Sequence, residues 1–450
     1  MARPMHEMAP LPAAFKAAGA LSGRVRVPGD KSISHRALML SALCVGESRI
    51  EGLLEGEDVH ATAAALRAMG AGIERDDHGC WIVHGVGVGG LLQPQGALEM
   101  GNSGTSTRLL MGLVASHAVS ATFTGDASLS RRPMKRVMDP LSTMGADFTA
   151  SHGGRLPIMV RGACPAVPIT YRLPMASAQV KSAILLAGLN TPGVTRVIEP
   201  VATRDHSERM LKGFGAELWI DREADGTRVV AIRGEGELKP QRIVVPGDPS
   251  SAAFPIVAAL LVPGSDVTVE NVGLNPTRAG LFRVLQDMGG NLVFENEREV
   301  GGEPVADIRA RHSRLYAIDV PPDIAPSMID EFPILFVAAA LAKGRTVTRG
   351  LEELRVKESD RLTLMARGLS RLGVRMEERP DGLAIDGSDG APFEANVPVT
   401  IAAELDHRIA MSFAVAGLVA RQPVEIDDMA PVATSFPGFT TMLRTLGAAA

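Results

Sequence analysis

The sequence predicts an α/β fold made of two similar domains, each containing three repeated units of helices and strands. Three observations support this prediction. A glycine that is suited to end a helix recurs at nearly even intervals along the 450 residues. Amphipathic segments precede these glycines, and short strand-like segments lie between them. A longer motif, Arg24 to Ser32, is echoed at Arg242 to Ser250, which divides the repeats into two sets.

The short repeat is an amphipathic helix followed by an apolar residue, a glycine and a strand-like segment. Glycine favours this position because it adopts the left-handed conformation that closes a helix. The intervals between successive glycines are 75, 70, 74, 84 and 74 residues, which gives six units. The six glycines are Gly70, Gly145, Gly215, Gly289, Gly373 and Gly447.

Within a unit, the apolar pattern predicts the order helix, strand, helix, strand, strand. In the first unit, the second helix spans Val59 to Met69, a strand at Ser48 to Gly52 precedes it, and a strand at Trp81 to Val83 follows. Further strands are predicted in later units at Val267 to Val272 and at Thr346 to Gly350. The two helices of each unit are therefore expected to pack against strands that lie on either side of them in the sequence.

The longer repeat sets the expected domain boundaries. Pro28-Gly29-Asp30 recurs as Pro246-Gly247-Asp248, at a spacing of 248 − 30 = 218 residues. We expect a flexible extension over residues 1–20, a first domain over 31–244, and a second domain over 21–30 plus 245–450. A cleft between the two halves is the expected ligand site.

Composition excludes several classes of protein. With 46 Lys+Arg against 51 Asp+Glu, the net charge is −5, and the chain lacks the basic excess of a nucleic-acid binder. The three widely separated cysteines indicate neither a disulfide framework nor a zinc site. No apolar run approaches the roughly 20 residues of a membrane-spanning helix, and no secretory signal is visible. We expect a cytoplasmic protein that is a monomer.

Basic residues occur where helices are expected to begin. A helix N-terminus carries partial positive charge and favours acidic side chains in its first turn. Each cation alone fits a solvated surface charge, but their recurrence in several units indicates an anionic ligand with more than one phosphate or carboxylate. Ser359 and Asp406 are expected to cap two of these helices. The cations are Lys31, Arg36, Arg108, Arg132, Lys357, Arg361, His407 and Arg408.

Four stretches resemble the signatures of the 5-enolpyruvylshikimate-3-phosphate synthase family, and the resemblance runs from about Leu21 to Gly447. They are residues 29–36, 101–108, 355–362 and 406–411. Further segments are similar to the class II branch of the family, which is bacterial. Those segments are Gly29 to Ser32, Ser177 to Lys181, Arg204 to Glu208 and Asn275 to Arg278.

The resemblance implies the enolpyruvyl transferase fold, a two-domain inside-out α/β barrel in which each domain has three βαβαββ units. It also implies transfer of the carboxyvinyl group of phosphoenolpyruvate to the 5-hydroxyl of shikimate 3-phosphate, with release of phosphate, in aromatic amino-acid (chorismate) biosynthesis. No metal or organic cofactor is implied. Both substrates carry a phosphate and a carboxylate, as the cations require.

The resemblance assigns three catalytic residues. Asp330 is the base near the acceptor hydroxyl, Glu358 is the acid/base at C3 of the enolpyruvate, and Lys31 spans both substrates. From the sequence pattern alone, Asp330 is equally suited to cap a helix, and Glu358 is equally suited to form a solvated pair with Arg361.

The resemblance also implies two binding sets. Small polar and basic groups would hold shikimate 3-phosphate, and arginines would hold phosphoenolpyruvate through bidentate contacts. The first set is Lys31, Ser32, Arg36, Ser177, Ala178, Gln179, Arg204, Asp330 and Lys357. The second set is Lys31, Gly104, Arg132, Gln179, Arg361 and Arg408, with His407 as an addition and Arg108 as an alternative structural cation.

Two positions depart from family patterns. Gly104 stands where glyphosate-insensitive class II members carry Ala, so sensitivity to that inhibitor is open. Ser435 stands where class I members place a lysine. Two other functions stay open: a UDP-N-acetylglucosamine enolpyruvyl transferase, which usually has a cysteine on the loop that here spans Asp126 to Arg132, and a non-catalytic anion-binding scaffold.

Overall fold

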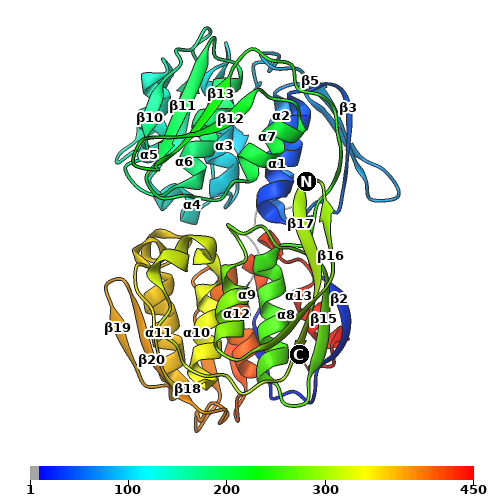
Figure 1. Cartoon of the computed structure of the whole chain (residues 1–450), viewed down its shortest axis with the longest axis vertical. Coiled ribbons are helices and arrows are strands. Elements are labelled where there is room, and N and C mark those ends of the chain that lie inside the picture. Colours follow the sequence, from blue (N-terminus) through cyan, green and yellow to red (C-terminus); the bar gives the residue numbers. More distant parts are fainter. Residues whose placement is uncertain (1–9, 450) are drawn as a thin grey trace. The chain divides into compact units, whose positions relative to one another are not determined.

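The computed structural model describes residues 10–449, and the chain divides into two compact units (Figure 1). Unit 1 consists of Met1–Pro28 and Pro246–Ala450, and unit 2 consists of Gly29–Val245. Each unit encloses its own hydrophobic core. The chain passes between the units next to the two Pro-Gly-Asp turns that the sequence repeat singles out.

Unit 2 contains three four-stranded sheets. One has the order β14 (Arg242–Val244), β3 (Val45–Glu51), β5 (Trp81–Val86), β4 (Gly72–Arg75). The second has the order β6 (Leu98–Glu99), β7 (Ser120–Thr124), β9 (Arg155–Arg161), β8 (Asp147–Ser151). The third has the order β10 (Thr170–Arg172), β11 (Val194–Glu199), β13 (Arg228–Arg233), β12 (Leu218–Arg222). In each sheet the first two strands are parallel and the other pairings are antiparallel.

The helices of unit 2 connect these strands. Each repeat has an apolar helix followed by an amphipathic one, as the sequence predicts, with the short α4 added in the second repeat. The helices are α1 (Lys31–Ala42), α2 (Glu57–Ala68), α3 (Gly104–Ala115), α4 (Ala127–Arg131), α5 (Lys135–Thr143), α6 (Ala178–Leu189) and α7 (His206–Gly213).

Unit 1 repeats this plan with one four-stranded and two three-stranded sheets. Its sheets are β2 (Ser22–Arg26), β15 (Asp266–Gly273), β17 (Glu303–Arg311), β16 (Asn291–Val300); then β18 (Lys343–Val347), β20 (Gly382–Ser388), β19 (Met376–Arg379); then β1 (Ala13–Phe15), β22 (Val424–Ile426), β21 (Val399–Ile401). Its α-helices are α8 (Pro249–Leu261), α9 (Gly280–Asp287), α10 (Phe332–Leu341), α11 (Arg361–Arg371), α12 (His407–Gly417) and α13 (Phe439–Thr445). Short 3₁₀ turns lie at η2 (Pro322–Ser327), η3 (Ile329–Glu331), η4 (Glu352–Val356) and η5 (Ala430–Thr434).

The predicted helix-ending glycines are confirmed. All six have positive φ, and each follows the C-cap residue of α2, α5, α7, α9, α11 or α13. In every case the residue after the glycine donates its backbone N–H to a carbonyl in the last turn, as Ala71 does to Leu66 at 3.0 Å. This is the Schellman closure, which requires a left-handed residue at the glycine position.

Two sheets take a strand from a distant part of the sequence. Strand β14 pairs in parallel with β3, with Arg242 opposite Arg49. Strand β2 pairs in parallel with β15, with Ser22 opposite Asp266. Each unit therefore completes its first repeat with a strand that lies next to a crossing point.

The expected flexible extension over residues 1–20 needs a correction for its second part. Ala13–Phe15 forms β1, which pairs antiparallel with β22, and Leu11 donates its backbone N–H to Asp428. The strand is held because Phe15 is fully buried in the core of unit 1. Residues 1–9 lie outside the described residues.

The helices form the inside of each unit and the sheets form the outside. Every residue of α8 and α10 is buried, whereas β9 alternates between exposed and buried side chains. A helix that is apolar all round belongs in a core, and a strand with alternating burial has one solvent face. The six sheets are separate from one another in the described residues. None of the described helices is long and apolar enough to cross a membrane.

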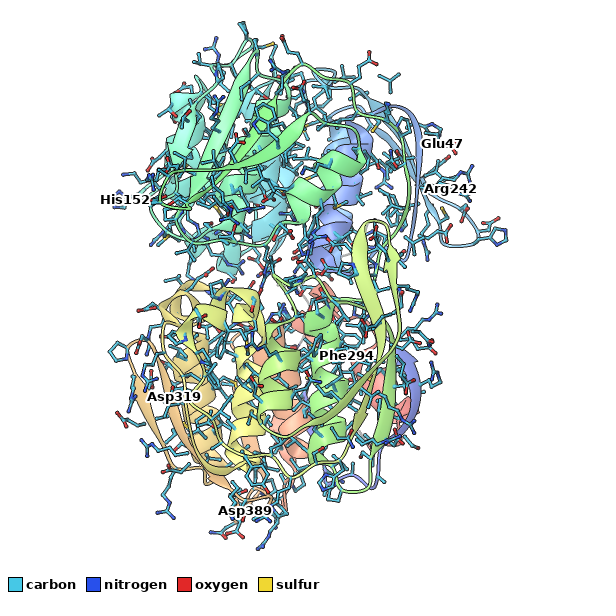
Figure 2. The ribbon with its side chains drawn as sticks, viewed as in Figure 1. Glu47, His152, Arg242, Phe294, Asp319 and Asp389 are labelled. Atoms are coloured by element: carbon cyan, nitrogen blue, oxygen red, sulfur yellow. The ribbon has the colours of Figure 1, made fainter. Side chains whose placement is uncertain are left out.

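Charged side chains cover the outer strands and loops. Figure 2 shows Glu47, Arg242 and Asp389 pointing away from the ribbon. Asp389 pairs with Arg314 at 2.6 Å, with both side chains substantially exposed. Such pairs contribute little to stability, because water screens them.

Candidate functional site

In unit 2, three apolar helices begin with a side-chain cap and no acidic residue in the first turn. Asp30 caps α1, Ser103 caps α3 and Ser177 caps α6, each by accepting a backbone N–H of the first turn. Backbone N–H groups and the helix dipole favour an anion at such termini. The predicted residues Lys31, Gly104 and Ala178 are the first residues of these helices, and Ser32 and Gln179 are the second residues of α1 and α6.

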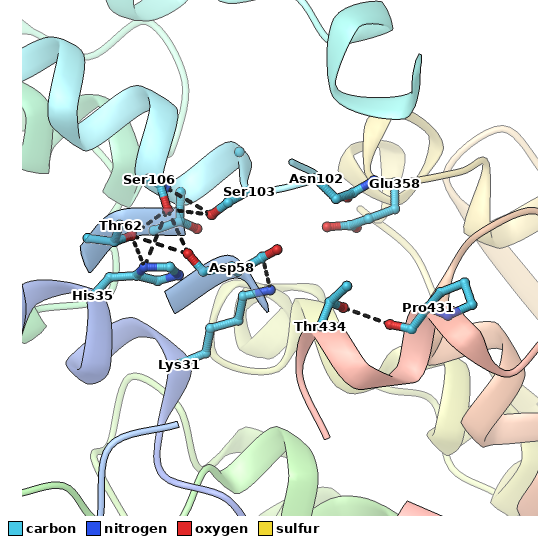
Figure 3. A network of polar contacts seen from close by, with 12 residues as sticks. Lys31, His35, Asp58, Thr62, Asn102, Ser103, Ser106, Glu358, Pro431 and Thr434 are labelled. Carbon is cyan, nitrogen blue, oxygen red and sulfur yellow. Dashed lines mark hydrogen bonds and ion pairs between the residues drawn. The ribbon is translucent and has the colours of Figure 1, made fainter. Parts of the chain in front are cut away.

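Lys31 forms an ion pair with Asp58 of α2, drawn as a dashed line in Figure 3. The side chains are 20% and 6% exposed, so the pair lies at the edge of the protein interior. Asp58 is not among the residues that the sequence singled out. Its carboxylate gives the Lys31 ammonium a fixed position at the start of α1.

The N-terminus of α3 lies between two arginines. A Cβ added at Gly104 would lie 2.7 Å from Arg108 Nη1 and 3.2 Å from Arg132 Nη1. Arg108 Nη1 also donates to Gln179 Oε1 at 3.0 Å, so α3 and α6 meet here. The prediction left Arg108 open as a structural cation. The geometry puts it with the predicted phosphoenolpyruvate residues Gly104, Arg132 and Gln179.

The sequence pattern predicts that Arg132 lies at a helix N-terminus. This prediction is wrong, because Arg132 is the C-cap residue of α4. Its Nη2 donates to Asn102 Oδ1 at 2.6 Å and to Ser128 Oγ at 3.2 Å. Asn102 in turn donates to Asp126, which caps α4. The guanidinium therefore reaches Gly104 because Asn102 holds it, a contact that the sequence pattern does not reveal.

A buried network of hydroxyl groups and an imidazole connects α1, α2 and α3 (Figure 3). His35 Nδ1 lies 2.8 Å from Thr62 Oγ1, which lies 2.6 Å from Ser106 Oγ, and Ser106 Oγ lies 2.6 Å from the capping hydroxyl of Ser103. Complete burial, together with the nearby charges of Lys31 and Arg36, places the pKa of His35 well below its ordinary value. His35 is therefore neutral near pH 7.

Arg36 connects α1 to α6 and α7. Its Nη2 donates to Ser182 Oγ and its Nε donates to Ser207 Oγ, each at 2.8 Å. Ser177 caps α6, and Arg204 lies two positions before the start of α7. The predicted shikimate 3-phosphate residues of unit 2 therefore come from the starts of α1, α6 and α7.

In unit 1, Arg361 is surrounded by three carboxylates. Its Nε lies 2.8 Å from Asp406 Oδ2, its Nη2 2.5 Å from Glu358 Oε2 and its Nη1 3.3 Å from Asp330 Oδ1. Burial alone would lower the pKa of Arg361, but the three carboxylates outweigh it and raise the pKa above the ordinary value. Burial likewise would raise the pKa of Asp406, and Arg361 reverses this, so the pKa is lowered.

Lys357 and Arg408 complete this cluster. Lys357 Nζ lies 3.6 Å from Asp330 Oδ1 and 2.8 Å from Glu353. Arg408 Nη1 donates to the backbone carbonyl of Asp330 at 3.1 Å. The unit 1 residues predicted for binding and catalysis thus gather around Asp330.

Of the two helix caps that the sequence predicts, Asp406 is confirmed and Ser359 is wrong. Asp406 caps α12 by accepting the Arg408 N–H, as predicted. Asp360, not Ser359, caps α11, because its carboxylate accepts the Thr363 N–H. Ser359 Oγ instead donates to Asp406 Oδ2 at 2.9 Å. His407 begins α12, and Ser435 follows η5 as a buried residue.

The arrangement can bind anions next to groups able to exchange protons. Unit 2 brings Lys31, Arg36, Gly104 and Gln179 to connected helix starts, with the Arg132 side chain beside Gly104, and unit 1 joins three carboxylates to a buried arginine. Among residues 10–449, no three or more His, Cys, Asp or Glu side chains are grouped to hold a metal ion. Cys44, Cys80 and Cys164 are free thiols.

The chain is similar to known proteins over nearly its whole length. The family EPSP synthase (3-phosphoshikimate 1-carboxyvinyltransferase) matches residues 15–443. A 3-phosphoshikimate 1-carboxyvinyltransferase from Sphingopyxis alaskensis is 69% identical over 98% of this chain and all of that protein. One from Zymomonas mobilis is 67% identical over all of this chain and 98% of that protein.

Solved structures agree with this similarity. An EPSP synthase from Acinetobacter baumannii has a TM-score of 0.85 at 47% identity and covers 97% of this chain and 98% of that one. The enolpyruvyl transferase NikO from Streptomyces tendae has a TM-score of 0.77 at 20% identity and shares the fold. The fold expected from the sequence is thereby confirmed, and the chain belongs to the EPSP synthase (3-phosphoshikimate 1-carboxyvinyltransferase) family.

Proposed function

We propose that this protein transfers the carboxyvinyl group of phosphoenolpyruvate to the 5-hydroxyl of shikimate 3-phosphate and releases phosphate, within aromatic amino-acid biosynthesis. Membership of the EPSP synthase family supports this reaction. The observation that carries it is the buried guanidinium of Arg361, which contacts both Asp330 and Glu358. An anion-binding group thus lies beside two carboxylates with the roles that the reaction needs.

The reaction requires three proton transfers, an addition at C2 and an elimination of phosphate. The acceptor hydroxyl loses a proton as its oxygen bonds to C2 of the enolpyruvate, and C3 gains a proton. C3 then loses a proton as the bond from C2 to the phosphate oxygen breaks. General acid–base groups and fixed cations supply this chemistry.

Three residues are proposed to act on the reacting atoms. Asp330 accepts the hydroxyl proton, and Glu358 exchanges the proton at C3. Lys31 stabilises the departing phosphate. Asp330 lies 3.6 Å from Lys357 Nζ and 3.3 Å from Arg361 Nη1, so the proposed base is next to two cations.

The proposed shikimate 3-phosphate contacts combine hydroxyls and amides for the ring with cations for its charged groups. The helix starts of α1 and α6 add backbone N–H donors to this set. The residues are Lys31, Ser32, Arg36, Ser177, Ala178, Gln179, Arg204, Asp330 and Lys357.

The proposed phosphoenolpyruvate contacts are dominated by arginine, which binds carboxylate and phosphate through two parallel hydrogen bonds. The adjacency of Arg108 and Arg132 to Gly104 supports this assignment in unit 2. The residues are Lys31, Gly104, Arg132, Gln179, Arg361 and Arg408.

Further properties belong to the same proposal. The protein acts as a cytoplasmic monomer without nucleic-acid partners and uses no metal or organic cofactor. Its two three-unit domains, 31–244 and 21–30 plus 245–450, each supply part of the substrate contacts. The segments at Ser177 to Lys181 and Arg204 to Glu208 support class II membership.

A phosphate-release assay tests the function. Phosphoenolpyruvate is supplied with shikimate 3-phosphate in one reaction and with UDP-N-acetylglucosamine in another. Release with shikimate 3-phosphate alone is expected, and release with the amino sugar alone would replace this proposal by the other transferase. Release with neither would favour an anion-binding scaffold. Adding glyphosate then tests Gly104, where inhibition is expected because no methyl group occupies the site.

A further inference from the structure

Four charged side chains form a buried cluster in unit 2 that the proposed chemistry does not use. Lys181 of α6 lies 2.7 Å from Glu208 of α7 and 2.9 Å from Glu199 at the end of β11. Arg228 at the start of β13 lies 2.5 Å from Glu199 and 3.0 Å from Glu208. The Lys181 and Glu199 side chains are fully buried, and Glu208 is nearly so.

Such a cluster has strict geometric requirements. Removing charges from water costs several kcal/mol per ion, and only close, well-directed partners offset that cost. The two cations and two carboxylates balance here, so the arrangement is tolerated only while α6, α7, β11 and β13 keep their positions. An apolar contact of the same size would allow the helices to slide.

The cluster lies directly behind proposed substrate contacts. Lys181 is on the first turn of α6, where Ser177 caps the helix and Gln179 follows. Glu208 is on the first turn of α7, and Arg204 precedes that helix. Locking Lys181 to Glu208 therefore sets the start of α6 relative to the start of α7.

The residues next to this ion pair hold Arg36. Ser182 follows Lys181 and Ser207 precedes Glu208 in the sequence. Their hydroxyls lie 2.7 Å apart, and each accepts a hydrogen bond of 2.8 Å from the Arg36 guanidinium. Arg36 is thus oriented by the same two helix turns that the buried cluster joins.

We propose that Lys181 and Glu208 are positioning residues for shikimate 3-phosphate, acting through the starts of α6 and α7 and through the Ser182 and Ser207 hydroxyls on Arg36. The inference rests on the proposed function, since it concerns the site for that substrate. The inference predicts different effects on the affinities for the two substrates. Arg132, a proposed phosphoenolpyruvate contact, is held by Asn102 and Ser128, which are not in this network.

The test compares Lys181→Met and Ser207→Ala with the parent protein. Lys181→Met keeps the length of the side chain but removes its charge, and Ser207→Ala removes one acceptor from Arg36 with minimal change in volume. Binding of shikimate 3-phosphate alone is measured by titration calorimetry, and KM is measured for each substrate. We expect each variant to weaken shikimate 3-phosphate binding about tenfold, because small misplacements of binding groups have effects of this size.

The KM for phosphoenolpyruvate should rise by a clearly smaller factor, since Gln179 shares the start of α6 but Arg132 keeps its own supports, Asn102 and Ser128. Thr191→Val is the matched control. Its hydroxyl donates to the Ala187 carbonyl at the other end of α6 and is equally buried, so both substrate affinities should stay at parent values.

The outcomes distinguish the inference from the function. If Lys181→Met does not fold, Ser207→Ala decides. Variants that melt cooperatively and bind shikimate 3-phosphate as the parent does would overturn the positioning role, as would an equal loss of affinity for both substrates. A parent protein that fails to bind shikimate 3-phosphate would overturn the proposed function itself.

Discussion

Arg361 Nε lies 2.8 Å from Asp406 Oδ2, and the two side chains are 1% and 0% exposed. The other oxygen of Asp406 accepts the backbone N–H of Arg408 at 2.9 Å. One buried carboxylate therefore orients the guanidinium of Arg361 and also starts the helix that carries Arg408. This relationship makes Asp406 a sensitive position, although it is not among the proposed substrate contacts.

Asp406→Asn should lower the free energy of unfolding by about 3 kcal/mol, because it removes one member of a buried ion pair while an asparagine still caps α12. Glu358 and Asp330 remain on Arg361, which keeps the loss at the lower end of the range for buried pairs. Urea denaturation measures it. The control is Asp360→Asn, which caps α11 and pairs with the partly exposed Arg355, where the loss should stay below about 1 kcal/mol. Equal losses in the two variants would contradict the special role of Asp406.

Gly104→Ala should raise the KM for phosphoenolpyruvate about tenfold, the size of one lost charge-assisted hydrogen bond. The new methyl carbon would lie 2.7 Å from Arg108 Nη1, so the guanidinium must move away from Gln179. Steady-state kinetics with each substrate varied in turn provide the measurement. Gly213→Ala is a suitable control, because a Cβ at that helix end meets no atom within 4 Å. An unchanged KM for phosphoenolpyruvate would show that Arg108 is not part of this site.

Much of the fold could be predicted from local patterns. The helix-ending glycines mark all six amphipathic helices, because a left-handed C′ residue is a local requirement that few other residues meet. Strand β1 could not be predicted in the same way. Its three residues, Ala13–Phe15, are too few to show the alternation of apolar and polar side chains that predicts a strand. They are held by a partner strand some 400 residues away in sequence.

The residues of the candidate site also differ in whether a local pattern or a long-range contact reveals them. Lys31, Arg361 and Arg408 could be found because cations at helix starts violate a local electrostatic preference. Asp58 and Asn102 could not, because their importance lies in contacts with Lys31 and Arg132 across the fold. An aspartate in the first turn of a helix is ordinary in a sequence, and only the tertiary structure shows what it holds.

Asp330→Asn and Glu358→Gln should each reduce kcat by about 10² to 10⁴, the range for removal of a general acid or base. Each change keeps the size of the side chain and a hydrogen-bonding oxygen for Arg361. Affinity for shikimate 3-phosphate should fall little with Glu358→Gln, which lies outside the proposed set for that substrate.

The control for these variants is Glu353→Gln, which removes an exposed partner of Lys357 and should leave kcat within about twofold. Stopped assays of phosphate release give kcat, and calorimetry gives the affinity. Turnover at the parent rate in either catalytic variant would remove that residue from the proposed mechanism.

Stability should fall as the pH drops below about 6.5, and His35 should be a main cause. Burial, with Lys31 and Arg36 nearby, holds the pKa of His35 well below 6.5, and burial also lowers the pKa of His117. The unfolded chain therefore binds these protons first. The contribution of these histidines to the free energy of unfolding is fully present above pH 6.5. It declines below that pH by up to about 1.4 kcal/mol per pH unit for each histidine.

His35→Gln should reduce this slope, because glutamine keeps hydrogen-bonding capacity towards Thr62 but does not titrate. Urea denaturation at pH 7.5, 6.5 and 5.5 measures the slope. Above pH 6.5 the variant loses whatever packing the imidazole supplied, but the dependence on pH between 6.5 and 5.5 should be shallower than in the parent. His152→Gln changes a histidine that Figure 2 shows on the outside of the fold, and it should leave the slope as it is. If the free energy of unfolding falls equally in His35→Gln and in the parent across this range, His35 takes up its proton equally in the folded and unfolded chains. The neutral imidazole is then not what links α1 to α2 and α3.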